Sequence, residues 1–336
     1  MKKFTLTLLM GLLILFLAAC GSDSEDKGND DAANADKNTE ETDTEAGEEE
    51  TADAGTVTVE HELDTTEVPK NPETVIVFDF GIVDSLDKLG VDIAGVAKSG
   101  TVPSYLSKYE GDEYANIGSL KEPDFEKISE VNPDLIIISG RQASLYDQFT
   151  ELAPTIHLGV DNENYMESFK GNMEVLGQIF DKETEVETEL AAIEDSIADL
   201  KEKADASEEK ALIILANDDK ISAYGQSSRF GIIHDVFGVK AADENIDAST
   251  HGMNVSFEYV MEQNPDILYV IDRGAVVSSG DGEGGAKQLV ENELVENTNA
   301  YKNEKVYYLD PEYWYLSGGG LVSVSEMVKQ IDESIN

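Results

Sequence analysis

A segment of 17 residues occurs twice in this chain, and the repeat constrains the fold more than any other feature. FEKISEVNPDLIIISGR (125–141) and FEYVMEQNPDILYVIDR (257–273) lie 132 positions apart and agree at seven of 17 positions, including the Asn-Pro-Asp run and the final arginine. Such self-similarity indicates a repeated structural unit. We therefore expect two lobes of the same build, with Arg141 and Arg273 at equivalent positions.

Apolar runs rich in Val and Ile alternate with helix-like segments, two of which are expected to begin near Asp84 and Asp124. The expected strands are residues 73–80, 92–97, 134–140, 155–160, 210–218, 220–225, 266–272 and 305–310. Their hydrophobicity is continuous rather than alternating, which predicts strands covered on both faces, as in a mostly parallel α/β sheet. The predicted fold class is therefore α/β, with two Rossmann-like lobes.

Residues 181–206 separate the two sets of strands and predict one long helix. Val186, Leu190, Ile193, Ile197 and Leu200 are spaced four, three, four and three residues apart, so they form an apolar stripe on a charged helix. The stripe is short for a free coiled coil, the alternative interpretation, and it suits a helix that connects the lobes. The expected lobes are then residues 56–180 and 207–336.

The first 55 residues have the composition of an export signal followed by a tether. Residues 1–19 contain two lysines and an apolar run that is short for a membrane span, and they precede Cys20, the only cysteine. The sequence LAAC-Gly resembles a lipobox, so Cys20 is the expected lipidation site; a buried structural cysteine is the alternative. Residues 20–55 include 14 acidic residues and two lysines, which predicts a solvated tether.

Composition also excludes some classes of function. A net charge of −46 makes nucleic acid and anionic lipid surfaces poor partners. The chain has no G-x-S-x-G, H-E-x-x-H or Walker motif, so we do not expect an enzyme. The four histidines show no metal-binding spacing, and no protein metal site is expected: His61, His157, His234 and His251.

The arginines are the most informative polar residues, because Arg141, Arg229 and Arg273 are the only three in the chain. Ligands of open α/β sheets bind at the carboxyl ends of strands, where all three are expected. Arg141 and Arg273 should then face each other across a cleft between the lobes, and Arg229 follows another strand. Three converging guanidinium groups predict a strongly anionic ligand. Salt bridges on the surface or between the lobes are the alternative.

Taken together, the lipobox, the tether, the paired FE…NPD segments, the connecting helix and the closing YYLDPEYWYLSGGG (307–320) resemble the iron-siderophore substrate-binding lipoproteins of bacterial ABC importers. The segment YGQSSRFGIIHDVFGVKAAD (224–243) is similar to the subgroup that binds ferric catecholates such as petrobactin. The resemblance implies a periplasmic-binding-protein-like fold of the helical-backbone type. It also implies that Lys121, Arg141, Arg229 and Arg273 contact the ligand, and that Trp314 lines the cleft, with core packing as an equal alternative.

The resemblance implies partners as well. The siderophore fills the coordination shell of the iron, so no cofactor is expected, and the protein would deliver its ligand as a monomer to an ABC permease dimer with ATPase subunits. Glu126 and Glu258 would dock on the two permease subunits; capping of a helix dipole is the alternative role. The expected location is the extracellular face of the cell membrane, through a lipid anchor, in a Gram-positive cell. A cobalamin or hydroxamate-siderophore binder on the same fold, or an adhesion or signalling lipoprotein, are the alternative functions.

Overall fold

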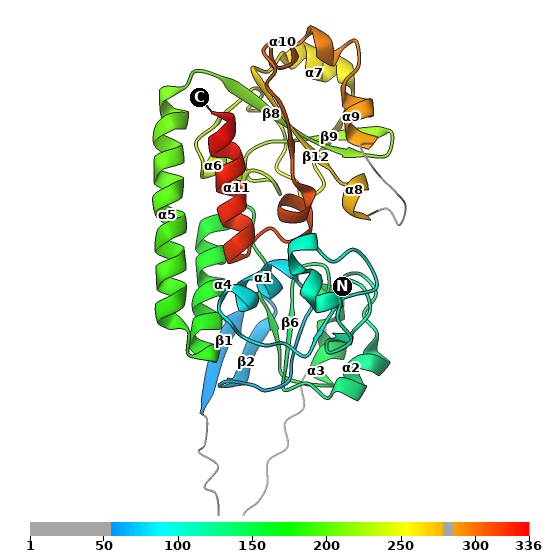
Figure 1. Cartoon of the computed structure of the whole chain (residues 1–336), viewed down its shortest axis with the longest axis vertical. Coiled ribbons are helices and arrows are strands. Elements are labelled where there is room, and N and C mark those ends of the chain that lie inside the picture. Colours follow the sequence, from blue (N-terminus) through cyan, green and yellow to red (C-terminus); the bar gives the residue numbers. More distant parts are fainter. Residues whose placement is uncertain (1–54, 278–284, 336) are drawn as a thin grey trace, which may run out of the picture. The chain divides into compact units, whose positions relative to one another are not determined.

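The two copies of the repeat form equivalent inner strands of two separate sheets in the computed structural model, which describes residues 55–277 and 285–335 (Figure 1). The first copy supplies helix α2 (Phe125–Val131) and strand β6 (Leu135–Ile138). The second supplies α7 (Phe257–Gln263) and β12 (Ile267–Asp272). The expected signal segment 1–19, Cys20 and all of the expected tether except its last residue lie outside the described residues.

The sheet of the N-terminal lobe is entirely parallel, as predicted, with the order β5-β4-β3-β6-β7. Its other strands are β3 (Val75–Val77), β4 (Gly95–Val96), β5 (Ala115–Asn116) and β7 (Thr155–His157). Its helices are α1 (Phe80–Lys88), α2, α3 (Tyr146–Thr150) and α4 (Tyr165–Phe180). The first helix begins at Phe80 rather than near Asp84, because the Asp79 side chain caps it by accepting from the backbone N–H groups of Gly81 and Ile82.

The sheet of the C-terminal lobe is mixed, with the order β11-β9-β8-β12-β13 and β10 beside β8. Strand β12 pairs in parallel with β8 and β13, whereas β9 returns antiparallel to β8 through a tight turn in which Asp218 has a positive φ of 53°. The strands are β8 (Lys210–Asn217), β9 (Lys220–Tyr224), β10 (Lys240–Ala241), β11 (Met253–Val255), β12 and β13 (Val306–Leu309). The short helices are α6 (Ile232–Asp235), α7, α8 (Gly274–Val277), α9 (Gly285–Val290) and α10 (Asn299–Lys302).

The Asn-Pro-Asp run of each repeat ends a helix and starts a strand. Asn132 and Asn264 cap α2 and α7 in the left-handed conformation, which Asn tolerates better than most residues. Proline follows in both copies and prevents the helix from continuing. In each repeat, the Asn-Pro-Asp run therefore ends the helix and leads the chain sharply into an inner strand.

The aspartate that closes the run fixes the register of that strand. Asp134 Oδ2 accepts from the backbone N–H of Thr74 at 2.8 Å, just before β3. Asp266 Oδ2 accepts from the backbone N–H of Lys210 at 3.1 Å, at the start of β8. Each carboxylate thus ties the repeat strand to its neighbouring strand, and the two lobes do this in the same way.

A long helix, α5 (Glu183–Ala206), connects the lobes within two residues of the predicted bounds (Figure 1). Four residues of its predicted stripe are buried and Ile197 is half-buried. The C-terminal helix α11 (Leu321–Ser334) packs on α5 and also on α1. One hydrophobic core therefore runs through both lobes, because residues of α1, α4, α5, α11 and both sheets belong to a single cluster.

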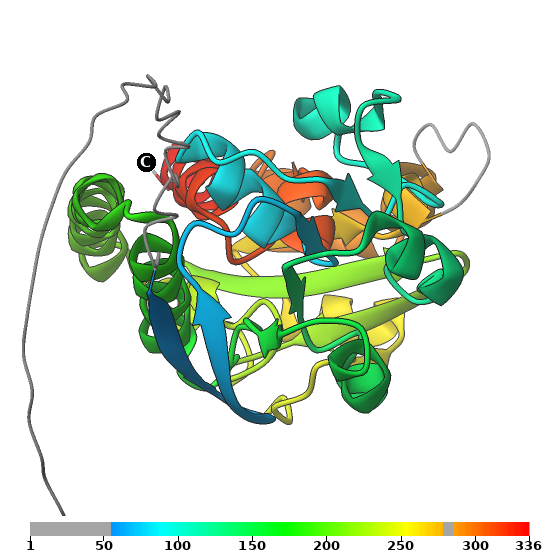
Figure 2. The ribbon, with the colours of Figure 1, turned by 90° about the horizontal axis from the view of Figure 1, so that it is seen from below.

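A two-stranded hairpin precedes the parallel sheet of the first lobe and was not predicted. It consists of β1 (Thr56–His61) and β2 (Asp64–Pro69), paired antiparallel, and its first strand lies against α4 (Figure 2). The hairpin contributes Val59 and Val68 to the shared core. Separate clusters cover the opposite faces of the two sheets, so the inner strands are buried on both sides, as their continuous hydrophobicity predicts.

Candidate functional site: a cluster of three arginines between the lobes

Arg141, Arg229 and Arg273 converge on one residue, Tyr315. The carbonyl oxygen of Tyr315 accepts from Nη2 of Arg141 at 3.1 Å and from Nη2 of Arg229 at 2.6 Å. The hydroxyl oxygen of Tyr315 accepts from Nε of Arg273 at 2.8 Å. The structure therefore brings together the three guanidinium groups that the sequence singled out, from both lobes; we call them the arginine cluster.

The aromatic ring of Tyr315 adds a second kind of contact. Cζ of Arg229 lies 4.1 Å from the ring centroid, within the range of a cation–π interaction, and Cζ of Arg273 lies 5.7 Å away. Arg273 also donates from Nη1 to the side-chain oxygen of Asn217, at the end of β8. Each guanidinium group is thus fixed from one side by uncharged partners.

Strand ends and a stiff turn position the arginines of the C-terminal lobe. The backbone N–H of Arg273 donates to the carbonyl of Ala216, which continues the ladder between β12 and β8 by one residue. Arg229 lies in a turn after β9, where Ser227 has a positive φ of 54° and its backbone N–H donates to Asp235 Oδ2 at 2.7 Å. Both side chains then reach Tyr315.

Tyr315 belongs to a short π-helix, η4 (Glu312–Leu316), which follows β13 and contacts the N-terminal lobe. Glu312 Oε2 accepts from the backbone N–H and the hydroxyl of Ser104 at 2.9 and 2.7 Å. Tyr105 donates from its hydroxyl to Ser317 Oγ at 2.6 Å, immediately after η4. These contacts hold the π-helix, and with it the Tyr315 carbonyl, against both lobes.

The cluster is strongly cationic, although the chain contains 70 acidic residues. Among residues 55–277 and 285–335, no ion pair joins Asp or Glu to any of the three arginines. Burial lowers the pKa of Arg229, and the nearby charge of Arg141 lowers it further. The local positive charge is thus uncompensated by any described carboxylate, and it is available to an anion.

The positive charge of the arginine cluster also changes the pKa of Tyr315. Burial alone would raise the pKa of its phenol, but the hydrogen bond from Arg273 and the positive charges of Arg229, Arg273 and Arg141 outweigh burial and lower the pKa. A phenolate beside three guanidinium groups is a favourable arrangement. The cluster can therefore stabilise an aromatic oxygen that has lost its proton.

Lys121 is exposed and has a different environment from the arginines. Its neighbour Leu120 accepts a hydrogen bond at its carbonyl from Nε2 of Gln142, the residue after Arg141, so the loop that carries the lysine is tied to the end of the first repeat. No contact in the described part of the chain links the ammonium group of Lys121 to the cluster. Its predicted role as a ligand contact remains a prediction.

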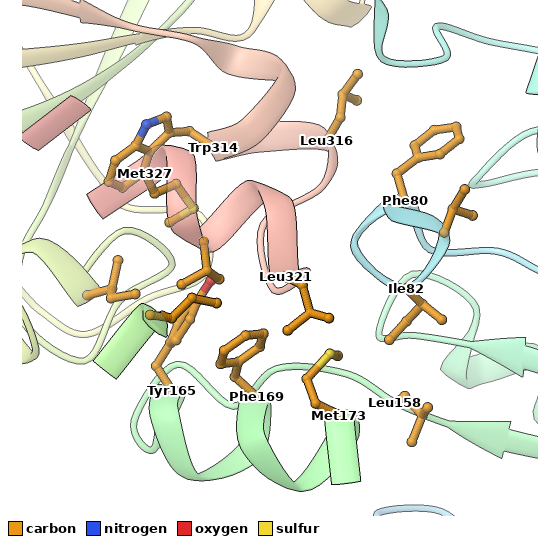
Figure 3. Close-up of a cluster of buried hydrophobic side chains, with 14 of the residues drawn as sticks. Phe80, Ile82, Leu158, Tyr165, Phe169, Met173, Trp314, Leu316, Leu321 and Met327 are labelled. Carbon is orange, nitrogen blue, oxygen red and sulfur yellow. The ribbon is translucent and has the colours of Figure 1, made fainter. Parts of the chain in front are cut away.

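The structure favours the core alternative for Trp314. Its side chain is only 2% exposed, lies beside Met327 in the shared core and donates from Nε1 to Gln330 Oε1 at 3.2 Å (Figure 3). The expectation that Trp314 lines the cleft is therefore corrected. The π-helix turns adjacent side chains in different directions, so the tryptophan faces α11 while Tyr315 faces the arginines.

Glu126 and Glu258 are exposed in the first turns of α2 and α7, on different lobes (Figure 1). The hydroxyl of Ser256 stabilises the ionised carboxylate of Glu258 and lowers its pKa. Both positions are equivalent in the repeat, as predicted. A role in capping is compatible with this placement, and so is contact with a partner.

Two cavities lie outside the arginine cluster. One of about 370 Å³ borders α2 and is lined by residues that include Asn116, Asp124, Lys127 and Glu130. Another of about 150 Å³ lies at the ends of β8 and β12, with Asp218 and Asp272 in its wall. Neither is lined by an arginine of the cluster among the described residues. Tyr315 itself fills the centre of the cluster.

Sequence reasoning missed Tyr315 and Asn217. Tyr315 lies in the YWYLSGGG part of the closing motif, but the sequence does not show which of the three aromatic residues in that part faces the arginines. Asn217 lies in the expected strand 210–218, and nothing in its residue type distinguishes it as part of a site. Its position at the carboxyl end of a strand was the available signal.

The described residues contain neither a metal centre nor a membrane span. No group of three or more His, Cys, Asp or Glu side chains is placed to hold a metal ion in this part of the chain. None of its helices combines the length and the apolar character that crossing a bilayer requires.

Two α/β lobes joined by a long helix, with a polar site between them, define a two-lobed binding protein. The chain belongs to the periplasmic binding protein family, whose pattern matches residues 75–313. Over 340 aligned residues it is 49% identical to the petrobactin-binding protein YclQ of Bacillus subtilis, an alignment that covers all of this chain and 99% of that protein. It is 35% identical to the ferric-anguibactin-binding protein FatB of Vibrio anguillarum, over 82% of this chain and 86% of that protein.

Solved structures agree with this assignment. The crystal structure of YclQ from Bacillus subtilis superposes with a TM-score of 0.79 at 54% identity and covers 84% of this chain and 99% of its own. The catecholate-siderophore-binding protein VctP from Vibrio cholerae gives a TM-score of 0.79 at 34% identity, over 83% and 99% of the two chains. The predicted fold class and the resemblance to siderophore-binding proteins are thereby confirmed.

Proposed function

We propose that this protein captures a ferric siderophore of the catecholate or mixed-catecholate type, such as petrobactin, at the arginine cluster and delivers it to an ABC permease. The observation that carries the proposal is the convergence of all three arginines without a described carboxylate partner. The relatives named above, which bind petrobactin, anguibactin and catecholate siderophores, support the same class of ligand. The proposed role is binding, without catalysis.

The chemistry of the ligand suits the site. Deprotonated catecholate oxygens around Fe³⁺ carry negative charge and belong to flat aromatic rings. Guanidinium groups donate several hydrogen bonds to such oxygens and stack on such rings. The siderophore supplies the ligands of the iron, so the protein needs none of its own. Lys121 would add a mobile positive charge at the edge of the site.

Ligand selectivity provides the first test. Purified protein, lacking residues 1–19, would be titrated by calorimetry with ferric petrobactin, a ferric trihydroxamate and cobalamin. We expect tight binding of ferric petrobactin and binding at least about a hundredfold weaker for the uncharged trihydroxamate complex, because two or more charge-assisted contacts would be lost. Equal or tighter binding of the trihydroxamate or cobalamin would overturn the assignment. A relative of 28% identity binds iron(3+)-hydroxamate, which makes this comparison necessary.

Delivery would use the two equivalent glutamates. A dimeric permease offers two like sockets, and the repeat offers two like carboxylates, Glu126 and Glu258. Each contact alone is weak because both side chains are exposed, but two contacts at a fixed separation reinforce each other. The permease would be assembled with its ATPase subunits, and the binding protein would act as a monomer.

Anchoring would use Cys20. Cleavage after residue 19 and lipidation of Cys20 would leave residues 20–55 as the tether of a protein held on the extracellular face of the membrane, as in a Gram-positive cell. A diacylglycerol supplies two acyl chains, which suffice for firm anchoring. Fractionation of cells that express Cys20→Ala tests this: the variant should leave the membrane fraction or remain as an uncleaved precursor. A fully processed variant that stays membrane-bound would contradict lipidation.

A further inference from the structure

Tyr315 contacts the arginine cluster through three different groups. Its carbonyl oxygen accepts from Arg141 and Arg229, its ring lies under the guanidinium group of Arg229, and its hydroxyl accepts from Arg273. One residue thereby fixes three like charges from two lobes that would otherwise repel one another. Because Tyr315 holds all three guanidinium groups, it determines how their remaining N–H groups are oriented toward a ligand.

We propose that Tyr315 is a positioning residue for ligand binding, which orders the three guanidinium groups in the free protein and sets an alkaline limit to binding when its hydroxyl loses its proton. This inference rests on the proposed function, since it concerns the same site. It differs from that proposal in assigning a role to a residue that bears no positive charge.

The arginines of the cluster keep unused N–H donors. An arginine has five N–H donors. Arg273 uses Nε for Tyr315 and one Nη1 hydrogen for Asn217, so both hydrogens of its Nη2 have no partner among the described residues. Arg141 and Arg229 each use only Nη2, for the Tyr315 carbonyl. Tyr315 thus holds each guanidinium group by part of its donors and leaves the remainder for an anion. Order of this kind strengthens binding, because the ligand does not have to immobilise three long side chains.

The charge of the cluster depends on the phenol of Tyr315. The titratable groups that face Tyr315 are Arg141 after β6, Arg229 after β9, Arg273 after β12 and the phenol of Tyr224 in β9. Helix α8, which also packs on η4, contributes no titratable residue. With a neutral phenol, the cluster presents three positive charges. With a phenolate, one of them is neutralised, and Tyr315 competes with the ligand for Arg273.

The arginines lower the pKa of Tyr315, so its phenol should ionise at a lower pH than an ordinary tyrosine does. Affinity for an anionic complex should then fall as pH rises through that ionisation. Because linkage is reciprocal, a bound anion must make Tyr315 harder to ionise.

Titration of the free protein tests the first half of the proposal. The 13 tyrosines would be labelled with ¹³C at Cζ, and their signals followed by NMR as pH is raised. We expect one signal to ionise earlier than the rest, to be missing in Tyr315→Phe and to ionise later when the diamagnetic gallium(III) complex of petrobactin is bound. A Tyr315 signal that ionises together with the other tyrosines, or that ignores the gallium complex, would overturn the proposal.

Affinity measurements test the second half. Tyr315→Phe retains the ring and the carbonyl but loses the bond to Arg273, so affinity for ferric petrobactin at neutral pH should weaken about three- to tenfold. Its affinity should also no longer fall at alkaline pH. Tyr315→Leu, which lacks the ring as well, should weaken binding further. The matched control is Tyr313→Phe, whose ring packs on Tyr105, and it should bind as the wild type does.

The outcomes separate the two proposals. If Tyr315→Phe matches the wild type in affinity and in pH profile, Tyr315 is not a positioning residue, while the proposed function stands. If the wild type binds neither ferric petrobactin nor any other ferric complex, the proposed function and the positioning role both fail. The NMR titration of the free protein would still show whether Tyr315 is coupled to the arginines.

Discussion

The carboxylate of Asp84 accepts a hydrogen bond at 3.0 Å from the backbone N–H of Ser323, which lies 239 residues later in the chain. Asp84 is fully buried in α1, and its other oxygen accepts from the backbone N–H of Val322 at 3.2 Å. Two residues of the first turn of α11 are therefore capped by a side chain of the N-terminal lobe. Burial raises the pKa of Asp84 to about 7, although the bonds from Ser323, Val322 and Tyr105 oppose the rise.

This contact predicts a pH dependence of stability. The unfolded chain releases the proton of Asp84 near pH 4, whereas the folded protein keeps it until about pH 7. The free energy of unfolding should therefore fall by a few kcal/mol on account of Asp84 as pH rises through this window, at about 1.4 kcal/mol per pH unit. Asp84→Asn stays uncharged and should lack this component. Urea unfolding of both proteins between about pH 4 and pH 8 measures the difference; parallel curves would show that Asp84 titrates normally.

The glycines after Ser317 predict a steric effect. A Cβ atom on Gly320 would collide with Asp84 and with the backbone carbonyl of Gly81, which cannot move aside. We expect Gly320→Ala to lower the free energy of unfolding by about 1–3 kcal/mol or to prevent folding. Gly318→Ala is the matched control, since its Cβ would meet only ordinary contacts of 3.5 Å or more. Equal thermal stability of the two variants would mean that α1 and the closing loop are not so tightly packed.

The arginines predict graded losses of affinity. Replacing one of Arg141, Arg229 or Arg273 by alanine should weaken binding of ferric petrobactin about ten- to over a hundredfold, because each charge-assisted contact contributes about 1.5–3 kcal/mol. The largest loss is expected for Arg229, which contacts both the carbonyl and the ring of Tyr315. Lys121→Ala should have a smaller effect. Calorimetry measures these constants, and unchanged affinity in all three arginine variants, with melting temperatures preserved, would remove the basis of the ligand assignment.

The paired glutamates predict a loss of transport without a loss of binding. Glu126→Ala combined with Glu258→Ala should leave the affinity for ferric petrobactin and the melting temperature nearly unchanged and abolish most uptake of radioactive iron by cells. Glu130→Ala with Glu262→Ala is a matched control, because it removes the same charge one helical turn later in the same two helices. Normal uptake by the first double variant would leave its two glutamates with a capping role only.

Much of the architecture could be predicted because it depends on local patterns. Continuous apolar runs predicted the main strands of both sheets, because strands that are buried on both faces consist of apolar residues. The stripe from Val186 to Leu200 predicted α5, because a helix that is buried along one side has apolar residues at helical spacing. The repeat predicted the equivalence of Arg141 and Arg273. The arginine cluster followed from that symmetry and from the rarity of arginine in the chain.

The remaining features depend on contacts between distant segments. Asp84 stands among polar residues of an amphipathic helix, and only the folded chain shows that it caps α11. The choice between Trp314 and Tyr315 depends on the turn of a π-helix, for which the sequence carries no clear pattern. The antiparallel course of β9 follows from a tight turn at Asp218 between two apolar runs, and the runs themselves do not show the direction of the second strand.

The packing of α11 on α1 has a consequence for how the chain reaches its final form. A ribosome makes Asp84 of α1 239 residues before Ser323 of α11, so a nascent chain that has not reached Val322 leaves Asp84 without its backbone donors and one side of the first lobe uncovered. The N-terminal lobe therefore cannot finish folding until α11 has been made. A chain that is truncated before Leu321 should expose the apolar residues that α11 normally covers, and proteases that recognise unfolded protein would remove it.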